Sequence, residues 1–354
     1  MRSGRDPELW LGGSPDRNAR TRGDAQPTPA AKALMKLGVF TVPLGHLPFE
    51  DMLDFVAGLG LRAIELGTGC WPGDAHCRPD ALLESRSKLN AFRRAMDDRG
   101  LIISALSCHG NPLHPVARIA KRDHAVFEKT VRLAQRLDIG SVVTFSGCPG
   151  ASPSAREPNW IVAPWPPEFS AMLEWQWTER VIPYWKETAK LARSAKVGIA
   201  IEMHPNFVVY NPQTMLRLRD VAPGTIGCNF DPSHMFWQGI DPVAAIRALG
   251  DCIRHCHAKD CRIDARNTAV DGVLDAKNYT RELERSWIFR TVGWGHGATV
   301  WKDIVTNLRL TGYDHVVSIE HEDTVMSGPE GLRKAVAFLK DVVIEDPPGD
   351  AFWA

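Results

Sequence analysis

The run Val197-Gly-Ile-Ala-Ile-Glu202 is a short apolar stretch that ends in a carboxylate, and three similar runs follow it. They are Thr225-Ile-Gly-Cys-Asn-Phe-Asp231, Cys252-Ile-Arg-His-Cys-His257 and His315-Val-Val-Ser-Ile-Glu320. Each run has the length of a buried strand. One charged strand end is common, whereas four in succession indicate a site. Three carboxylates and one imidazole form an oxygen-rich ligand set for a divalent cation.

The rest of the chain alternates strand-like and helix-like segments from Met35 onward. Eight strands are expected, at residues 36–42, 61–66, 101–107, 139–145, 197–203, 225–231, 252–257 and 315–320. Amphipathic stretches lie between them, at Phe49–Leu59, Arg78–Arg99, His124–Leu137, Val181–Ser194 and Gly328–Asp341. This alternation predicts right-handed βαβ units, and eight units close into an α/β (β/α)₈ TIM barrel. A doubly wound open sheet is the rival, but ligands on the last four strands favour closure.

In a TIM barrel all strands end at one mouth, where active sites lie. Glu202 and Asp231 would therefore meet His257 and Glu320 there. By strand alternation, His204 shares a face with Glu202, and His234 lies just past its strand, within reach of a metal. The alternative for each acid is a strand end bound by neighbouring backbone, and for each histidine a place in the core.

Further polar residues are expected at the same mouth. Lys259 lies on the face of His257, and Asp260 is available to orient that ring. His109 follows strand three, and Glu65 lies at the end of strand two. For Lys259 the alternative is an ordinary surface cation.

Composition limits the classes of function. A single α/β barrel can reach 354 residues. Lys+Arg and Asp+Glu balance at 42 each, so we expect no overall attraction to nucleic acid or to an anionic membrane. Eight cysteines without paired spacing are typical of reduced thiols in a cytoplasmic protein. No apolar stretch approaches the length of a membrane span.

Three regions are expected along the chain. Residues 1–33 are rich in Arg, Asp, Gly and Pro and lack a hydrophobic period, which predicts a disordered leader. Its acidic residues argue against a transit peptide. The barrel is expected over residues 34–345, with a tail at 346–354. Met35 directly precedes the first strand and is an alternative translation start.

A long loop follows strand four and is expected to help select the substrate. It carries Trp160, Trp165, Trp175 and Trp177. Tryptophan faces stack on sugar rings or aromatic groups, which makes Trp165 a candidate substrate contact. The alternative is that the indoles attach the loop to the barrel.

A second long insertion, Cys261 to Gly297, follows strand seven. It is rich in charged residues and ends in Gly293-Trp-Gly-His296 before Gly297. The glycines suggest a mobile hinge or a tight lid turn. Arg290 and His296 are expected to reach the site when such a lid closes.

Four motifs together resemble a known family. They are Glu-x-His-Pro at 202–205, Asp-x-x-His at 231–234, His-x-Lys-Asp at 257–260 and Ile-Glu at 319–320. The succession resembles the sugar phosphate isomerase/epimerase family, whose xylose isomerase-like TIM barrel is related to the AP endonucleases. The family includes ketose 3-epimerases, inosose dehydratases and hydroxypyruvate isomerases. The resemblance covers about residues 36–343 and is specific for fold and metal site, but weak for substrate.

The resemblance implies one divalent ion held by Glu202, Asp231, His257 and Glu320, with Mn²⁺ preferred over Mg²⁺, Co²⁺ or Zn²⁺. It also implies an isomerase or epimerase of a sugar, a sugar phosphate or a polyol. Glu202 and Glu320 would exchange protons with an enediolate, which the cation stabilises. Lys259 or Arg290 would neutralise alkoxide, phosphate or carboxylate groups.

Other functions stay open. A lyase on a 3-keto glycoside, as in the large subunits of C-glycoside deglycosylases, would use His204 or His234 as base and would need a small partner subunit. An inosose dehydratase is another alternative. DNA repair like that of endonuclease IV requires a three-metal cluster and a basic groove, which the zero net charge counts against. Homodimers or homotetramers fit the family, but no interface is evident in the sequence.

Overall fold

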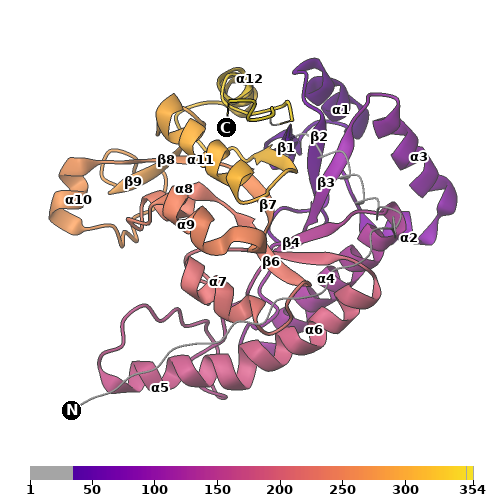
Figure 1. Ribbon diagram of the computed structural model, residues 1–354. Coiled ribbons are helices and arrows are strands. Elements are labelled where there is room, and N and C mark those ends of the chain that lie inside the picture. The colour runs from indigo at the N-terminus through magenta and orange to yellow at the C-terminus, as the bar shows by residue number, and fades with distance from the viewer. Residues whose placement is uncertain (1–34, 348, 354) are drawn as a thin grey trace, which may run out of the picture. The chain divides into compact units, whose positions relative to one another are not determined.

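The computed structural model describes residues 35–347 and 349–353, so the predicted leader lies outside the described residues. Eight parallel strands form a closed barrel in the order β1-β10-β7-β6-β5-β4-β3-β2 (Figure 1). They are β1 (Lys36–Phe40), β2 (Ala63–Gly67), β3 (Ile102–Ser107), β4 (Ser141–Phe145), β5 (Gly198–Glu202), β6 (Ile226–Phe230), β7 (Ile253–Ala258) and β10 (Val316–Ile319). The predicted TIM barrel is confirmed, and each strand lies within two residues of its predicted ends.

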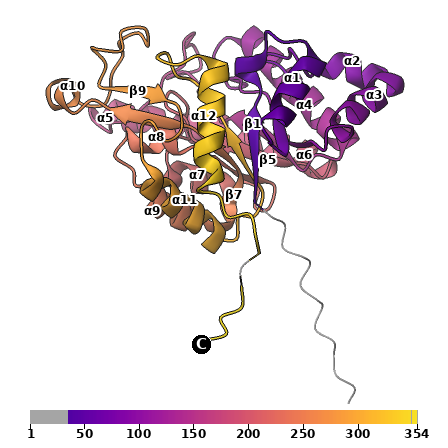
Figure 2. The ribbon, with the colours of Figure 1, turned by 90° about the horizontal axis from the view of Figure 1, so that it is seen from above.

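Closure occurs between the first and last barrel strands, where Lys36 pairs with Val316 and Val39 with Ile319. Helices follow the strands and surround the barrel (Figure 2). The longer ones are α1 (Phe49–Gly58), α3 (Arg86–Asp97), α4 (Ala117–Leu137), α6 (Ile182–Ser194), α7 (Pro212–Arg219), α9 (Pro242–Leu249), α11 (Ala298–Leu310) and α12 (Gly328–Lys340). The other helical segments are η1 (Val42–Leu44), α2 (Pro79–Glu84), α5 (Pro167–Trp175), η2 (Gln176–Val181), α8 (Pro232–Phe236), η3 (Gly250–Cys252) and α10 (Ala265–Asp271).

Two predicted helices have different bounds. The stretch 78–99 divides at Ser85, whose extended backbone ends α2 and whose hydroxyl accepts a hydrogen bond from Lys88 N at the start of α3. Such N-capping favours a new helix over continuation of the old one. Helix α4 begins at Ala117 rather than at His124.

The loop after β4 is partly helical. Helix α5 runs into the π-helical turn η2 and then into α6. At their junction the buried amide of Gln176 donates to the carbonyl oxygens of Pro149, Gly150 and Asn159. This side chain therefore ties the start of the loop to the helix that follows it.

The insertion after β7 contains an antiparallel hairpin of β8 (Asp260–Ile263) and β9 (Trp287–Arg290). The carboxylate of Asp260 accepts hydrogen bonds from the backbone N–H groups of Gly293, Gly295 and His296. It also accepts one from Nε1 of Trp301. The glycine segment predicted to be a hinge is thus bound to one buried carboxylate, and Asp260 does not orient His257.

The barrel interior contains both an apolar cluster and a group of buried polar side chains. Ala105, Val143 and Ala200 form a small apolar cluster. Next to the site, His255 lies 2.9 Å from Oδ1 of Asn229 and 3.3 Å from Oγ of Ser104. These buried polar groups satisfy one another and form a hydrogen-bonded base for the strand ends.

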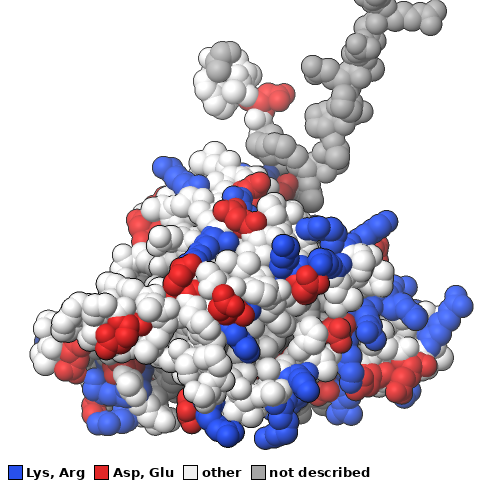
Figure 3. All heavy atoms as spheres, turned by 90° about the horizontal axis from the view of Figure 1, so that it is seen from below, with Lys and Arg blue, Asp and Glu red and all other residues white. Residues whose placement is uncertain are grey.

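The surface charge, the cysteines and the helices can each be compared with what the composition predicts. Acidic and basic side chains are interspersed on the face shown in Figure 3. All eight cysteines are free thiols, and seven of them are buried. In the described part of the chain, no helix is long and apolar enough to cross a membrane.

Candidate metal centre

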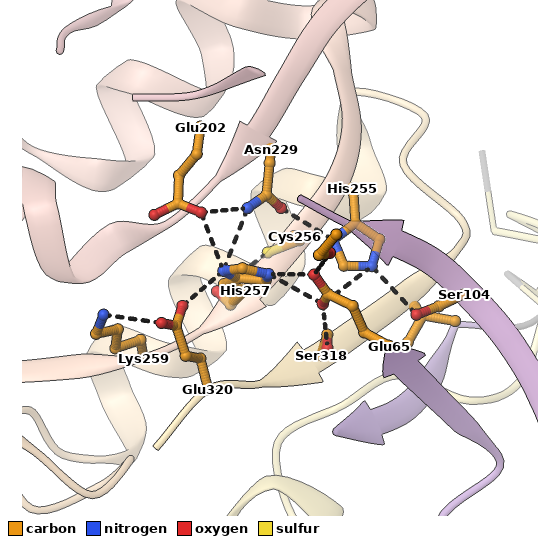
Figure 4. Close-up of polar contacts among 12 residues, drawn as sticks. Glu65, Ser104, Glu202, Asn229, His255, Cys256, His257, Lys259, Ser318 and Glu320 are labelled. Atoms are coloured by element: carbon orange, nitrogen blue, oxygen red, sulfur yellow. Dashed lines mark hydrogen bonds and ion pairs between the residues drawn. The ribbon is translucent and has the colours of Figure 1, made fainter. Parts of the chain in front are cut away.

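Four strand-end residues converge at the mouth of the barrel. Glu202 ends β5, Asp231 follows β6, His257 lies near the end of β7 and Glu320 follows β10. One ligand atom of each lies within 4.8 Å of the others, and all four residues are buried. The structure therefore brings together the complete quartet that the sequence singled out (Figure 4, which labels three of its members).

The quartet offers buried carboxylate oxygens that a cation could bind. Within residues 35–347, Oδ2 of Asp231 and Oε2 of Glu320 are buried and form no well-aligned hydrogen bond. Each lies close to an imidazole nitrogen, Oδ2 of Asp231 at 3.2 Å from Nε2 of His234 and Oε2 of Glu320 at 2.7 Å from Nδ1 of His257. Oδ1 of Asp231 accepts from Ser233 N at the start of α8. Because several carboxylates buried together need compensating positive charge, a divalent cation fits this set of donors.

His257 presents Nδ1 to the quartet and Nε2 to the barrel interior. Nδ1 lies 2.7 Å from Oε2 of Glu320 and 3.5 Å from Oε2 of Glu202. Nε2 lies 3.0 Å from both oxygens of Glu65. A carboxylate behind a metal-binding histidine fixes the orientation of its ring and increases its basicity.

Glu65 is itself held firmly. It accepts hydrogen bonds from Ser107 Oγ at 2.5 Å and Ser318 Oγ at 2.7 Å. Burial alone would raise its pKa, but the imidazoles of His257 and His255 hold the pKa of Glu65 at about 2. Glu65 was predicted to contact substrate. Instead it lies behind the ring of His257, where it occupies the orienting role predicted for Asp260.

The two candidate proton carriers have different neighbours. Oε2 of Glu202 lies 2.9 Å from Nε2 of His109 and accepts from Nδ2 of Asn229 at 3.0 Å. Oε1 of Glu320 accepts from Nζ of Lys259 at 3.0 Å. Both carboxylates are therefore held by groups that favour the ionised form.

The pKa values of the four residues differ, because their neighbours differ. Burial opposes ionisation of both Glu202 and Glu320. His109 nevertheless lowers the pKa of Glu202 well below its usual value. Lys259 lowers the pKa of Glu320 to about 2. Burial raises the pKa of Asp231 to about 6. Burial would lower the pKa of His257, but Glu65 and Glu320 raise it well above the usual range. A cation would therefore replace the proton on His257.

His204 and His234 lie together beside Glu202. Their ring centroids are 4.2 Å apart, and Nε2 of His234 lies 3.5 Å from Oε1 of Glu202 and 3.2 Å from Oδ2 of Asp231. Nδ1 of His204 donates to the carbonyl oxygen of Pro205, which leaves Nε2 as the acceptor. Burial lowers the pKa of His204 to about 3, so this imidazole is neutral.

A cavity of about 1110 Å³ opens above the quartet. Glu202, His204, Lys259, Glu320 and His109 all line it. Five aromatic residues form much of the remaining wall: Trp71, Phe145, Phe207, Tyr279 and Phe289. Phe145 is the last residue of β4, so its position at the mouth could be predicted in the same way as that of the quartet. The sequence around the other four aromatics does not predict that they line the cavity.

Three predicted substrate residues lie away from this cavity. Trp165 is 77% exposed on the loop after β4. Nε of Arg290 donates to Asp323 at 3.1 Å. His296 is bound to Asp260 at 2.7 Å and stacks on Phe236 at 3.7 Å. The structure does not bring these side chains to the quartet.

The parallel barrel and its strand-end quartet can be compared with known proteins. A family model described as "Xylose isomerase-like TIM barrel" matches residues 53–342. The chain belongs to this family. The match covers most of the barrel and includes all four members of the quartet.

Individual proteins are also similar to this chain. "Uncharacterized protein YfiH" from Bacillus subtilis (strain 168) is 41% identical over 312 residues, which cover 87% of this chain and 99% of that protein. A D-psicose 3-epimerase structure determined in the presence of D-fructose has a TM-score of 0.56 at 18% identity, covering 87% of this chain and 99% of the other.

A dehydratase is similar in fold as well. The probable 3-DHS dehydratase AsbF of Bacillus anthracis has a TM-score of 0.59 at 18% identity and covers 86% of this chain and 99% of its own. At such identity the two solved structures show a shared fold. The chain thus has an enzyme-like barrel whose structural neighbours include epimerases and a dehydratase.

Proposed function

We propose that this protein is a divalent-metal-dependent isomerase or epimerase of a small polyhydroxy carbonyl compound. The observation that carries the proposal is the pair Glu202 and Glu320, two buried carboxylates that belong to the metal quartet and also line the cavity. Each is therefore available both to a cation and to a substrate.

A divalent cation held by the quartet would stabilise negative charge that develops on a substrate oxygen next to the reacting carbon. The residues support Mn²⁺, Mg²⁺, Co²⁺ or Zn²⁺, because three carboxylates and one imidazole suit each of these ions. We take Mn²⁺ as the preferred ion in the proposal.

Glu202 and Glu320 would move the proton. Both have lowered pKa values, so each is ionised at neutral pH and can accept a proton from carbon. They come from β5 and the end of β10, with β6 and β7 between them in the barrel. This separation suits approach to a substrate from two sides. His109 and Lys259 contact the two carboxylates and hold them in place.

The named neighbours support the choice of chemistry. A D-psicose 3-epimerase shares the barrel and was crystallised with a ketose. Epimerisation next to a carbonyl requires proton removal and return, which a pair of carboxylates can perform.

A lyase is the second candidate, and His204 is the observation that favours it. Its neutral imidazole lines the cavity with Nε2 as an acceptor, so it can serve as a base beside Glu202. Such an enzyme would eliminate water or an aglycone from a keto sugar. In the deglycosylase form of this proposal, a small partner subunit completes the enzyme.

The deciding experiment is incubation of metal-loaded protein in D₂O with ketoses, inososes and 3-keto glycosides, followed by NMR. Deuterium at a carbon next to the carbonyl, with the skeleton intact, supports the isomerase or epimerase. Release of water or aglycone supports the lyase instead. Protein that retains less than half an equivalent of any divalent metal, and gains no activity when metal is added, contradicts both.

A further inference from the structure

The cavity wall has an uneven charge. Seven charged side chains line it: Asp123, Glu202, Glu320, Glu322, Asp323, Lys259 and Arg122. Five are acids and two are cations. A bound cation would offset part of this excess at the quartet, but Glu322 and Asp323 do not belong to the quartet.

Lys259 is already paired with two carboxylates, which compete with any substrate anion. Its Nζ lies 3.0 Å from Oε1 of Glu320 and 2.6 Å from Oε2 of Glu322. The same ammonium lies 4.3 Å from the ring centre of Phe289, and only 2% of Lys259 is exposed. Two carboxylates and an aromatic face therefore already surround the one buried cation of the wall.

Arg122 is the other cation, and it lies at the open edge of the cavity. Its side chain is 63% exposed, and its Nε lies 2.7 Å from Oδ1 of Asp123. Arg290, expected from the sequence to neutralise substrate anions, is bound to Asp323. Among the described residues of the wall, no unpaired cation faces the quartet. A phosphate there would meet carboxylates instead, which is strongly unfavourable.

Aromatic side chains surround the quartet on three sides. Trp71, after β2, lies 6.2 Å from the ring of His109, which itself contacts Glu202. Phe145 and Phe207 stack at 4.2 Å on the side of β4 and β5. On the side of the hairpin, Phe289 stacks on Tyr279 at 5.7 Å.

Two of these aromatics are only partly covered. Trp71 is 54% exposed and Tyr279 is 49% exposed, although both line the cavity. Large exposed aromatic faces beside a polar site are typical of surfaces that bind an apolar group. The volume of about 1110 Å³ also corresponds to a drug-sized ligand, for which pockets of roughly 300–1,000 Å³ are usual.

We propose that the substrate is an uncharged polyhydroxy carbonyl compound joined to an apolar group the size of an aromatic ring, and that sugar phosphates are excluded. This inference rests on the proposed function, since it names the substrate class of the same site. The polyhydroxy part lies at the quartet, and the apolar part extends to the open part of the wall, where Trp71 and Tyr279 are exposed.

The test is calorimetric binding to the full chain loaded with Mn²⁺, under conditions in which NMR shows that no probe is converted. Methyl and phenyl β-D-glucopyranoside differ only in the apolar group, while D-glucose and D-glucose 6-phosphate differ only in the phosphate. We expect the phenyl glycoside to bind at least tenfold more tightly than the methyl glycoside. We expect the phosphate to bind at least tenfold more weakly than glucose.

Variants separate the cavity wall from general effects. Trp71→Ala and Tyr279→Ala should each reduce the phenyl preference severalfold and leave methyl glycoside binding nearly unchanged. Trp165→Ala, on the exposed loop outside the cavity, is the matched control and should change neither affinity. Glu322→Gln should increase the affinity for glucose 6-phosphate, because it releases Lys259 from one of its two carboxylates.

Three results would overturn the inference: equal affinity for the phenyl and methyl glycosides, a phosphate that binds as well as glucose, or no binding of any probe. These measurements involve no turnover. A retained phenyl preference together with failed deuterium exchange would therefore contradict the isomerase but not the substrate class.

Discussion

Nε2 of His257 lies 3.0 Å from both carboxylate oxygens of Glu65, across 192 residues of sequence. The contact joins β7 to β2, two strands that are separated by β10 and β1 in the barrel (Figure 4). It directs Nδ1 of the same ring at Glu202 and Glu320. The geometry of the candidate metal centre therefore depends on a carboxylate outside the quartet.

Glu65→Gln should weaken metal binding by about 10–100-fold, the usual effect of removing a carboxylate behind a metal-binding histidine. Gln keeps the shape and can still accept one hydrogen bond, so the change removes chiefly the charge. Ser318→Ala, which deletes another hydrogen bond to Glu65, is the matched control and should have a smaller effect. Chelator competition measures both affinities, and equal affinities in folded Glu65→Gln and native protein would contradict the role of Glu65.

Glu320→Gln should retain the fold and lose at least about 100-fold in rate, the scale of general acid–base catalysis. Glu322→Gln is the control for Lys259, because both carboxylates contact that ammonium but only Glu320 belongs to the quartet. Metal content and deuterium-exchange rate should be measured on the same samples. Near-normal turnover by Glu320→Gln at full metal occupancy would falsify its assignment as proton carrier.

Because the pKa of Asp231 is raised, we expect the stability of the metal-free protein and its metal affinity to change in opposite directions with pH. Its folded pKa of about 6 lies above the ordinary value of 3.8, so the native state holds this proton to higher pH than the unfolded state. Its contribution to the stability of metal-free protein therefore falls as pH rises from about 4 to 6, and stays low above pH 6. Metal binding should instead improve over that range, because the cation requires the ionised carboxylate.

The matched variant for this pH dependence is Asp231→Asn. In metal-free protein its melting temperature relative to native protein should be higher by a few degrees at pH 8 than at pH 4, roughly the scale of one or two kcal/mol. The variant should also lose most of its metal affinity. A melting-temperature difference that does not change between pH 4 and pH 8 would contradict the raised pKa of Asp231.

Gly295→Ala should destabilise the protein by about 1–3 kcal/mol, the cost of overpacking. A methyl group at Gly295 would collide with the carbonyl oxygen of Cys261 and with the carboxylate of Asp260, which binds the segment 293–296. Gly297→Ala is the control, since a methyl group there meets no described atom within 4 Å. Its cost should stay below about 1 kcal/mol, from helix N-cap preference alone. Denaturant unfolding measures both, and equal costs would contradict this account.

Several elements missed by the sequence analysis carried a readable signal. Helices α7, α8 and α9 each begin at proline after an asparagine or aspartate, at Asn211, Asp231 and Asp241. In each case the side chain accepts a backbone hydrogen bond from the first turn, which is a standard helix start. The break at Ser85 follows the same rule. Attention to caps as well as hydrophobic period would have located these helices.

Other features had no local signal. The antiparallel pairing of β8 with β9 joins Asp260 to Arg290 across an insertion of mixed charge, where hydrophobic period gives little guidance. The aromatic wall draws on the end of β4 and on the segments that follow β2, β5 and β7, including β9. The predicted tryptophans of the β4 loop do not line the cavity, and Trp177 packs into the core instead.

The sequence by itself determined the barrel and the four strand-end residues of the quartet. Buried strands appear as short apolar runs, and parallel closure sends every strand end to one mouth, so both follow from local pattern. The tertiary structure decided which nitrogen of His257 faces the quartet, and that Lys259 is already neutralised. These depend on contacts with Glu65 and Glu320, which lie 192 and 61 residues away from their partners. Charge and orientation in a buried site are set by all neighbours in space, and only folding brings those neighbours together.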